Sequence, residues 1–328
     1  MTPENFQQLF TRLETEVRKV IVGHDDVLRR VLIGFFAGGH VLLEGVPGLG
    51  KTLLVKTLSQ ALGISFKRIQ FTPDLMPSDI VGTQVLAENN GRRDFQFKKG
   101  PIFAHVVLAD EINRATPKTQ SAVLEAMEEK QVTVFGESYT LESPFMVLAT
   151  QNPVELEGTY PLPEAQLDRF FFKLLVAPPS PTELREILQR TTGTRSSDAE
   201  PVLGSDGGPL IQEMKELLRQ VLIAPPIEDY VVRLVHATQP VGTNGAVPIA
   251  AVKQYLRFGS SPRGAQAVIL GAKGHALADG RVHVSYADVE QVIYPALRHR
   301  IILNFQAEAE NVAADQILAE LMAKVPRN

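Results

Sequence analysis

HVLLEGVPGLGKT, residues His40–Thr52, decides the fold of this chain. It begins with an apolar run, Val41 to Leu43, that predicts a short buried strand, and it ends at the start of a helical pattern. The glycines in between belong to the spacing G-x-x-x-x-G-K-[ST]. Glycines let successive backbone N–H groups point at one anion, and the helix N-terminus behind them adds partial positive charge. The stretch therefore predicts a phosphate-binding loop between a strand and a helix.

Two side chains at the end of this loop supply the remaining chemistry. Lys51 is a compact ammonium that can reach the β- and γ-phosphates of a nucleotide, and Thr52 offers its hydroxyl to Mg²⁺. The alternative is a glycine-rich turn without a ligand, which is disfavoured because residue types, spacing and flanking pattern all agree. The residues expected to contact the nucleotide here are Gly45, Pro47, Gly48, Leu49, Gly50, Lys51, Thr52 and Leu53.

A second stretch, VVLADE, places two carboxylates directly after a predicted buried strand, at Asp110 and Glu111. Ligands of open α/β sheets bind at this end of the strands. Asp110 is placed to hold Mg²⁺, and Glu111 has the chemistry to orient and activate a water molecule. Adjacent carboxylates also cap helices, so this stretch is informative chiefly together with the phosphate loop. The pair favours hydrolysis over transfer to a bound hydroxyl, which has less need of a water-activating carboxylate.

Two weaker signals lie near the expected site. Asn152 follows a predicted strand at 145–150 and can hydrogen-bond the attacking water or the γ-phosphate, although an Asn-Pro turn explains it equally simply. The apolar turn at Val22 and Gly23 precedes the phosphate loop and could flank an adenine ring. A plain turn between two helices is an equally good interpretation of these two residues.

The order of elements predicts an α/β fold. Strands alternate with helical patterns up to residue 176, which is typical of a doubly wound, mostly parallel sheet. Two hairpins interrupt it, one with arms at 85–88 and 95–98 around Asn89-Asn90-Gly91, and one at 131–141 turning at Gly136-Glu137. A short helix is expected at Asp79–Leu86. The five strands of the sheet are expected at 41–43, 66–70, 106–109, 145–150 and 171–176.

The proline-rich run Ala177–Pro181 predicts a domain boundary, with an αβα core at 1–177 and a helical domain at 178–328. Residues 191–209 are expected to form a flexible loop, and 281–285 one short strand. Arg263 stands at a helix start, where its charge opposes the helix dipole, and such conflicts often mark function. Helices are expected at 210–223, 227–238, 248–257, 262–278, 286–297 and 311–324.

Composition excludes several classes of protein. The 328 residues contain no cysteine, so disulfides and zinc–thiolate sites are absent, and the histidines form no H-x-x-x-H pair. No apolar run approaches the length of a membrane span, and the first ten residues lack the pattern of a signal peptide. A cytoplasmic protein is therefore expected. The net charge of −4 argues against a dedicated nucleic-acid binder.

Five segments together resemble the MoxR family of AAA+ ATPases, in the helix-2-insert group, close to the magnesium chelatase ATPase subunit. The phosphate loop alone would not name the family, but the order of the segments with the inserted hairpin does. The segments are the Walker A motif GVPGLGKT (45–52), the Walker B motif VVLADEINRA (106–115), ATQNP (149–153), EAQLDRF (164–170) and SSPRG (260–264).

The resemblance implies a five-stranded P-loop core followed by a smaller all-helical lid, assembled in a ring, usually a hexamer, with ATP between subunits. It implies that Lys51, Thr52 and Asp110 hold ATP and Mg²⁺, that Glu111 is the catalytic base, and that Asn152 is the first sensor.

The resemblance also assigns roles to four further residues. Arg169 matches the arginine finger donated to a neighbour's γ-phosphate, and Arg263 matches the second sensor, reaching ATP in its own subunit. Val22 and Gly23 fall where the family lines the adenine pocket. The family further implies a chaperone that matures or inserts metal into a protein client, often with a partner carrying a von Willebrand factor A domain. The polar segment at 191–209 is longer than the family pattern.

Two other functions stay open. A nucleic-acid motor would use the basic hairpin at 92–99 to contact phosphates. Charged strand edges that prevent aggregation explain that hairpin as well. The hairpin at 131–141 carries Glu137 and no lysine or arginine, which suits phosphate binding poorly. An ATP-gated adaptor would bind partners in its ATP state, with hydrolysis incidental.

Overall fold

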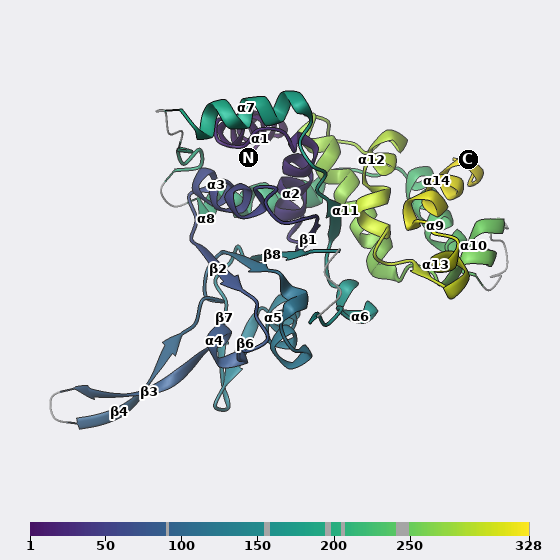
Figure 1. Ribbon diagram of the computed structural model, residues 1–328. Helices are drawn as coiled ribbons and strands as arrows, with labels where there is room; N and C mark the ends of the chain where they lie inside the picture. The colour runs from purple at the N-terminus through teal and green to yellow at the C-terminus, as the bar shows by residue number, and fades with distance from the viewer. Residues whose placement is uncertain (90–91, 154–157, 194–197, 205–206, 241–248, 328) are drawn as a thin grey trace.

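A five-stranded parallel sheet forms the centre of the computed structural model, which describes residues 1–89, 92–153, 158–193, 198–204, 207–240 and 249–327 (Figure 1). The strand order is β2-β5-β8-β1-β9, with β1 paired on both sides to parallel neighbours. The predicted α/β sheet is therefore confirmed. Its strands are β1 (Val41–Glu44), β2 (Phe66–Gln70), β5 (Val106–Asp110), β8 (Met146–Gln151) and β9 (Phe172–Leu175).

Side chains alternate between the two faces of this sheet, and each face has its own core. Val106 and Leu108 pack toward α1, α2 and α3, whereas Val107 and Ala109 pack toward α5. Figure 1 shows these helices on opposite sides of the sheet. The central strands β5 and β8 are buried on both faces and are therefore short continuous apolar runs, whereas the edge strand β2 exposes Lys67 and Arg68. The helices are α1 (Pro3–Arg18), α2 (Asp25–Ala37), α3 (Lys51–Leu62) and α5 (Pro117–Glu129).

Two hairpins leave the sheet on the α5 side, and β3–β4 projects away from the body of the molecule (Figure 1). The predicted helix at Asp79–Leu86 is wrong in its second half, because Gly82, at φ +99°, ends α4 and the chain then pairs across the hairpin. The predicted turn residues 90–91 lie outside the described residues. The second hairpin turns at Phe135-Gly136, both at positive φ, one residue earlier than expected. The bounds are α4 (Pro77–Val81), β3 (Gly82–Asn89), β4 (Arg92–Lys99), η1 (Ile112–Arg114), β6 (Gln131–Val134), β7 (Glu137–Thr140) and α6 (Glu164–Leu167).

The C-terminal part is largely helical, as predicted, with two small departures. Residues 281–285 form only an isolated bridge, between His283 and Leu222, rather than a strand. A two-stranded ladder that the sequence did not indicate joins the residues after α10 to those before α13. The bounds are α7 (Pro181–Thr191), α8 (Gly208–Gln220), α9 (Pro225–Ala237), α10 (Ala250–Tyr255), β10 (Leu256–Phe258), α11 (Pro262–Ala278), α12 (Tyr286–Leu297), β11 (Ile302–Leu303), α13 (Phe305–Ala309) and α14 (Ala314–Lys324).

Part of the predicted loop at 191–209 packs on the core. Val202 N donates to Ala61 O of α3 at 2.8 Å, and the Leu203 side chain is buried in the main hydrophobic core. Residues 194–197 and 205–206 of this loop lie outside the described residues, as do 241–248 ahead of α10. None of the helices in the described part of the chain is long and apolar enough to cross a bilayer.

The main hydrophobic core continues from the sheet into the helices beyond residue 177. At Gly271 of α11 an added Cβ would lie 2.8 Å from the ring of Phe172 in β9, so only glycine allows this close approach. The boundary at 177/178 stays a prediction, because the two regions share one apolar core.

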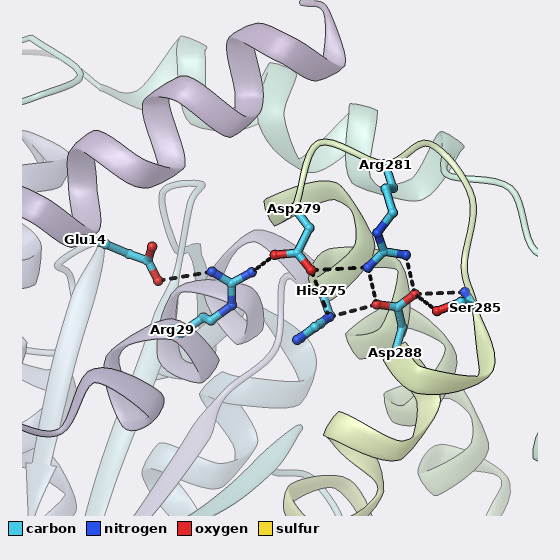
Figure 2. A network of polar contacts seen from close by, with 7 residues as sticks. All are labelled: Glu14, Arg29, His275, Asp279, Arg281, Ser285 and Asp288. Atoms are coloured by element: carbon cyan, nitrogen blue, oxygen red, sulfur yellow. Dashed lines mark hydrogen bonds and ion pairs between the residues drawn. The ribbon is translucent and has the colours of Figure 1, made fainter.

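A network of charged side chains adds a polar connection between α1, α2 and the α11–α12 region (Figure 2). Arg29 of α2 bridges Glu14 of α1 and Asp279, which follows α11. Asp279 also contacts Arg281, whose guanidinium donates to Asp288 at 2.6 Å. His275, Asp279 and Asp288 lie close enough to hold a metal ion, but Arg281 already contacts both carboxylates. The cluster is therefore accounted for by ion pairs.

We expect Asp288→Asn to lower the free energy of unfolding by about 2–4 kcal/mol, because Asp288 is 1% exposed and is the common acceptor of Arg281, His275 and Ser285. Burial alone would raise the pKa of Asp288, but hydrogen bonds from these three residues outweigh it and hold the pKa below its ordinary value. The contribution is therefore present above the pKa of an unfolded aspartate, about 3.9, and is lost as the pH falls below that value.

Urea unfolding followed by circular dichroism at pH 7 and at stepwise lower pH measures this effect. The control is Asp279→Asn, which removes a carboxylate that is 40% exposed and is expected to cost less than about 1 kcal/mol. An equal loss for both variants would contradict the central role of Asp288.

Candidate active site

The phosphate loop, the acidic pair and Asn152 line one cavity of about 360 Å³ at the carboxyl end of the sheet. The sheet order explains this, because β1, β5 and β8 are neighbours and the segment following each strand reaches the same edge. Among the predicted residues the cavity lining contains Pro47, Gly48, Leu49, Gly50, Lys51, Thr52, Leu53, Asp110, Glu111 and Asn152. Gly45 lies behind it, where an added Cβ would be 2.7 Å from Val176 O.

Lys51 stabilises the conformation of the phosphate loop through hydrogen bonds to its backbone. Its Nζ donates to the carbonyl oxygens of Gly45 and Val46, and burial lowers its pKa while Asp110 and Glu111 oppose that shift. Gly48 and Gly50 both have positive φ, a backbone conformation that glycine adopts without the strain a side chain would add. The ammonium is thus positioned at the start of α3 beside backbone N–H groups, the arrangement that binds phosphate.

Asp110 and Thr52 have the donor chemistry for Mg²⁺. Thr52 Oγ1 lies 3.3 Å from Asp110 Oδ2, and Thr150 donates to Asp110 Oδ1 at 2.6 Å. Hydroxyl and carboxylate oxygens are the hard ligands this ion prefers, with nucleotide phosphates and water completing its shell. These two residues therefore fit the predicted metal role.

Glu111 has a left-handed backbone, φ +57°, that few non-glycine residues adopt outside special sites. Its N–H donates to Thr150 Oγ1 at 2.8 Å. Its carboxylate accepts hydrogen bonds from Gln70 at 2.7 Å and from Arg114 at 3.0 Å. The side chain is thus held on the cavity wall, beside the phosphate loop.

A second cavity, about 140 Å³, meets the first at the phosphate loop, since both are lined by Gly48, Leu49, Gly50 and Leu53. Val22 lines it, and Gly23 adjoins it at φ +72°, where a Cβ would lie 2.9 Å from the Glu183 carboxyl carbon. Helix α7 forms one wall of this second cavity through Ile187, Arg190 and Thr191. Arg190 fixes α7 there by donating to the carbonyl groups of Arg18 and Lys19 at the end of α1. An apolar cavity beside a phosphate site suits a nucleotide base.

Arg169 and Arg263 lie together in a third cavity, of about 270 Å³, that shares no residue with the other two. Both guanidinium groups contact Glu128, which is on α5, and Arg169 also donates to Leu124 O at 2.7 Å. The structure therefore brings the two arginines to each other and not to Lys51. This arrangement gives no support to Arg263 contacting a nucleotide in its own subunit.

Long-range contacts fix the position of these arginines, and the sequence gave no signal for them. Arg300, 3% exposed, pairs with Asp168 at 2.9 Å and donates to Phe170 O at 2.6 Å. Ser261 donates to the same Asp168 carboxylate at 2.9 Å. Asp168 thus ties the Arg169 segment to the start of α11. Sequence reasoning missed Arg300 and Glu128 here. It also missed Arg68, which lines the first cavity, and Gln70, which donates to Glu111.

Comparison with known proteins places this fold among the AAA ATPases. The model of the ATPase family associated with various cellular activities matches residues 40–172, and an AAA lid domain matches residues 249–321. A crystal structure of a protein assigned as an ATPase, from Cytophaga hutchinsonii, superposes with a TM-score of 0.90 at 41% identity, covering 99% of this chain and 96% of that one.

The sequence relatives specify the family. Chaperone MoxR1 of Mycobacterium tuberculosis is 44% identical over 94% of this chain and 80% of its own length. Protein YeaC of Bacillus subtilis is 41% identical over 98% and 96%, and Protein MoxR of Methylorubrum extorquens is 31% identical over 94% and 92%. The chain belongs to the MoxR family of AAA+ ATPases.

Proposed function

We propose that this chain hydrolyses ATP with Mg²⁺ at the interfaces of a homo-oligomeric ring and remodels a protein client as a chaperone. The observation that carries the proposal is the single cavity that contains Lys51, Asp110 and Glu111 together. These three supply a phosphate-binding cation, a metal carboxylate and a base, which is the complement that hydrolysis of a nucleoside triphosphate needs.

In this proposal each residue acts at a stated atom. Lys51 Nζ exchanges its two carbonyl acceptors for phosphate oxygens, and the glycine N–H groups hold the remaining charge. When bound, Mg²⁺ neutralises phosphate charge from Thr52 and Asp110. Glu111 takes a proton from water, which attacks the γ-phosphorus as the bond to the β-phosphate oxygen breaks. Asn152 orients that water or the γ-phosphate.

The position of the arginines supports a ring. Arg169 and Arg263 line a cavity separate from the one with Lys51, so they would act on a nucleotide only if a second copy presented it. We therefore extend the proposal to both arginines, acting on the neighbouring subunit. A heterologous interface of this kind forms a ring when its rotation closes, and the family implies a ring of six subunits.

We expect Lys51→Ala to weaken ATP binding by about 10- to 100-fold, because it removes charge-assisted hydrogen bonds to phosphate. Calorimetric titration with ATP measures the change. Lys56→Ala on the exposed side of the same helix is the matched control and should bind as the unaltered protein does. Equal ATP affinity in the two variants would overturn the assignment of the phosphate loop.

The client and partner can be identified by capturing the proteins that stay bound to a variant held in its ATP state. The name of the relative Chaperone MoxR1 supports a protein client, and the family pattern supports a partner with a von Willebrand factor A domain that helps in maturation or metal insertion. Affinity capture with the Glu111→Gln variant in ATP, compared with Lys51→Ala, selects proteins held only in the ATP state.

The nucleic-acid motor is less well supported by the described residues. Lys99 of the basic hairpin already contacts an aromatic ring of this chain, with its Nζ 5.1 Å from the centre of the Phe103 ring. The other hairpin carries a carboxylate, Glu137, which accepts a hydrogen bond from Tyr139 and would repel phosphate. ATPase activity stimulated by DNA and falling steeply with salt would favour the motor over the chaperone.

A further inference from the structure

Arg68 reaches the metal side of the first cavity from β2, one of the two edge strands of the five-stranded sheet. Its Nε and Nη2 atoms both donate to Asp110 Oδ2, at 2.9 and 2.7 Å. Thr52 Oγ1 lies 3.3 Å from that same oxygen. The guanidinium therefore contacts the carboxylate oxygen that a metal ion shared by Thr52 and Asp110 would use.

We propose that Arg68 is the counter-cation of the metal site: it neutralises Asp110 before Mg²⁺ binds, and it competes with the ion for Oδ2. The inference rests on the proposed function, since it takes Asp110 as the metal carboxylate. It adds a residue that sets how tightly the site holds its metal.

The surroundings of Asp110 leave Oδ2 as the carboxylate oxygen at which Mg²⁺ can replace Arg68. Oδ1 is held by the Thr150 hydroxyl at 2.6 Å, and Thr150 in turn accepts the N–H of Glu111. The Asp110 side chain is 11% exposed and stays in place, whereas Arg68 is 47% exposed and can turn toward water. Two cations on one oxygen repel each other, so the ion displaces at least one of the two Arg68 hydrogen bonds.

The same exchange reaches the carboxylate that activates water. Arg68 Nη2 also donates to Gln70 Oε1, and Gln70 Nε2 donates to Glu111 Oε2 at 2.7 Å. When Arg68 leaves Asp110, Gln70 loses a partner that orients its amide. Metal binding is thereby coupled to the position of Glu111 through two neighbouring side chains of β2.

Metal affinity is the direct test, and it needs no catalysis. Mn²⁺ is titrated into the full-length protein with saturating ADP, and free Mn²⁺ is measured by electron paramagnetic resonance. We expect Arg68→Gln to bind Mn²⁺ about three- to tenfold tighter, a modest effect because the ion pair is half exposed. Affinity for ADP in EDTA should stay unchanged, which assigns the effect to the metal.

Lys67→Gln is the matched control, since Lys67 is the neighbouring exposed cation on the other side of the strand, and its Mn²⁺ affinity should not change. Arg68→Lys keeps the positive charge but not the paired N–H donors of the guanidinium, and should give a smaller increase in Mn²⁺ affinity. If circular dichroism shows that Arg68→Gln is unfolded, Arg68→Lys serves as the test variant. Unchanged or weaker Mn²⁺ binding in the Arg68 variants, with normal binding by the unaltered protein, overturns this inference alone. Absence of Mn²⁺–ADP binding in the unaltered protein overturns the proposed nucleotide site as well.

Discussion

Glu111→Gln is expected to lower the rate of ATP hydrolysis by about 10²- to 10⁴-fold while ATP stays bound. The amide matches the carboxylate in shape but cannot accept a proton from water. Lys51 and the phosphate-loop N–H groups are untouched, so binding energy from the phosphates is retained. Single-turnover hydrolysis of radiolabelled ATP measures the rate, and calorimetry measures the affinity.

The control for this prediction is Glu4→Gln, an exposed glutamate in the first turn of α1, whose turnover should equal that of the unaltered protein. Glu111 also accepts hydrogen bonds from Gln70 and Arg114, so the variant must be shown to melt at a similar temperature. A loss of ATP binding that parallels the loss of rate would contradict a role in water activation. Hydrolysis at the normal rate would remove Glu111 from the mechanism.

Arg169→Ala is expected to bind ATP normally and to hydrolyse it about 10³- to 10⁵-fold more slowly, the size of effect found for arginine fingers. In the proposed role its guanidinium stabilises charge that develops only during phosphoryl transfer, so the ground state is little affected. In this structure Arg169 contacts Glu128 and Leu124, and it lines a different cavity from Lys51. The loss should therefore occur across an interface between subunits.

Mixing subunits separates action across an interface from action within one subunit. In rings assembled from equal amounts of Arg169→Ala and Glu111→Gln subunits, about a quarter of the interfaces regain both groups. We expect hydrolysis to recover accordingly. No recovery in oligomers shown to exchange subunits would rule out Arg169 as a finger for the neighbour. Arg185→Ala, an exposed arginine on α7, is the control and should retain activity.

Much of the fold follows from local patterns. The phosphate loop stands between β1 and α3 because its glycines and the apolar run before it leave few other conformations. Helix α1 begins at Pro3 with Thr2 as its cap, and α12 spans the residues that its periodicity indicated. The predicted helix at Asp79–Leu86 was wrong because its last five residues gain cross-strand partners, and those partners lie too far along the chain for local propensity to reveal.

The candidate site divides in the same way. Spacing was sufficient to nominate Lys51 and Asp110, since each motif carries its own strand and its own ligand chemistry, and the structure places both in one cavity. Spacing could not show that Arg263 lies with Arg169, because these side chains meet through Glu128. The roles of all these residues in catalysis stay predictions that the variants above test.

The sequence by itself determined the parallel α/β core, the phosphate loop and the acidic pair, because each depends on residue types within one strand and the turn after it. Only the tertiary structure decided which side chains surround them. Arg68 meets Asp110 from 42 residues away, and Arg263 meets Glu128 from 135 residues away. Such contacts depend on the strand order β2-β5-β8-β1-β9 and on where the helical region packs, and neither is encoded in the local spacing of residues.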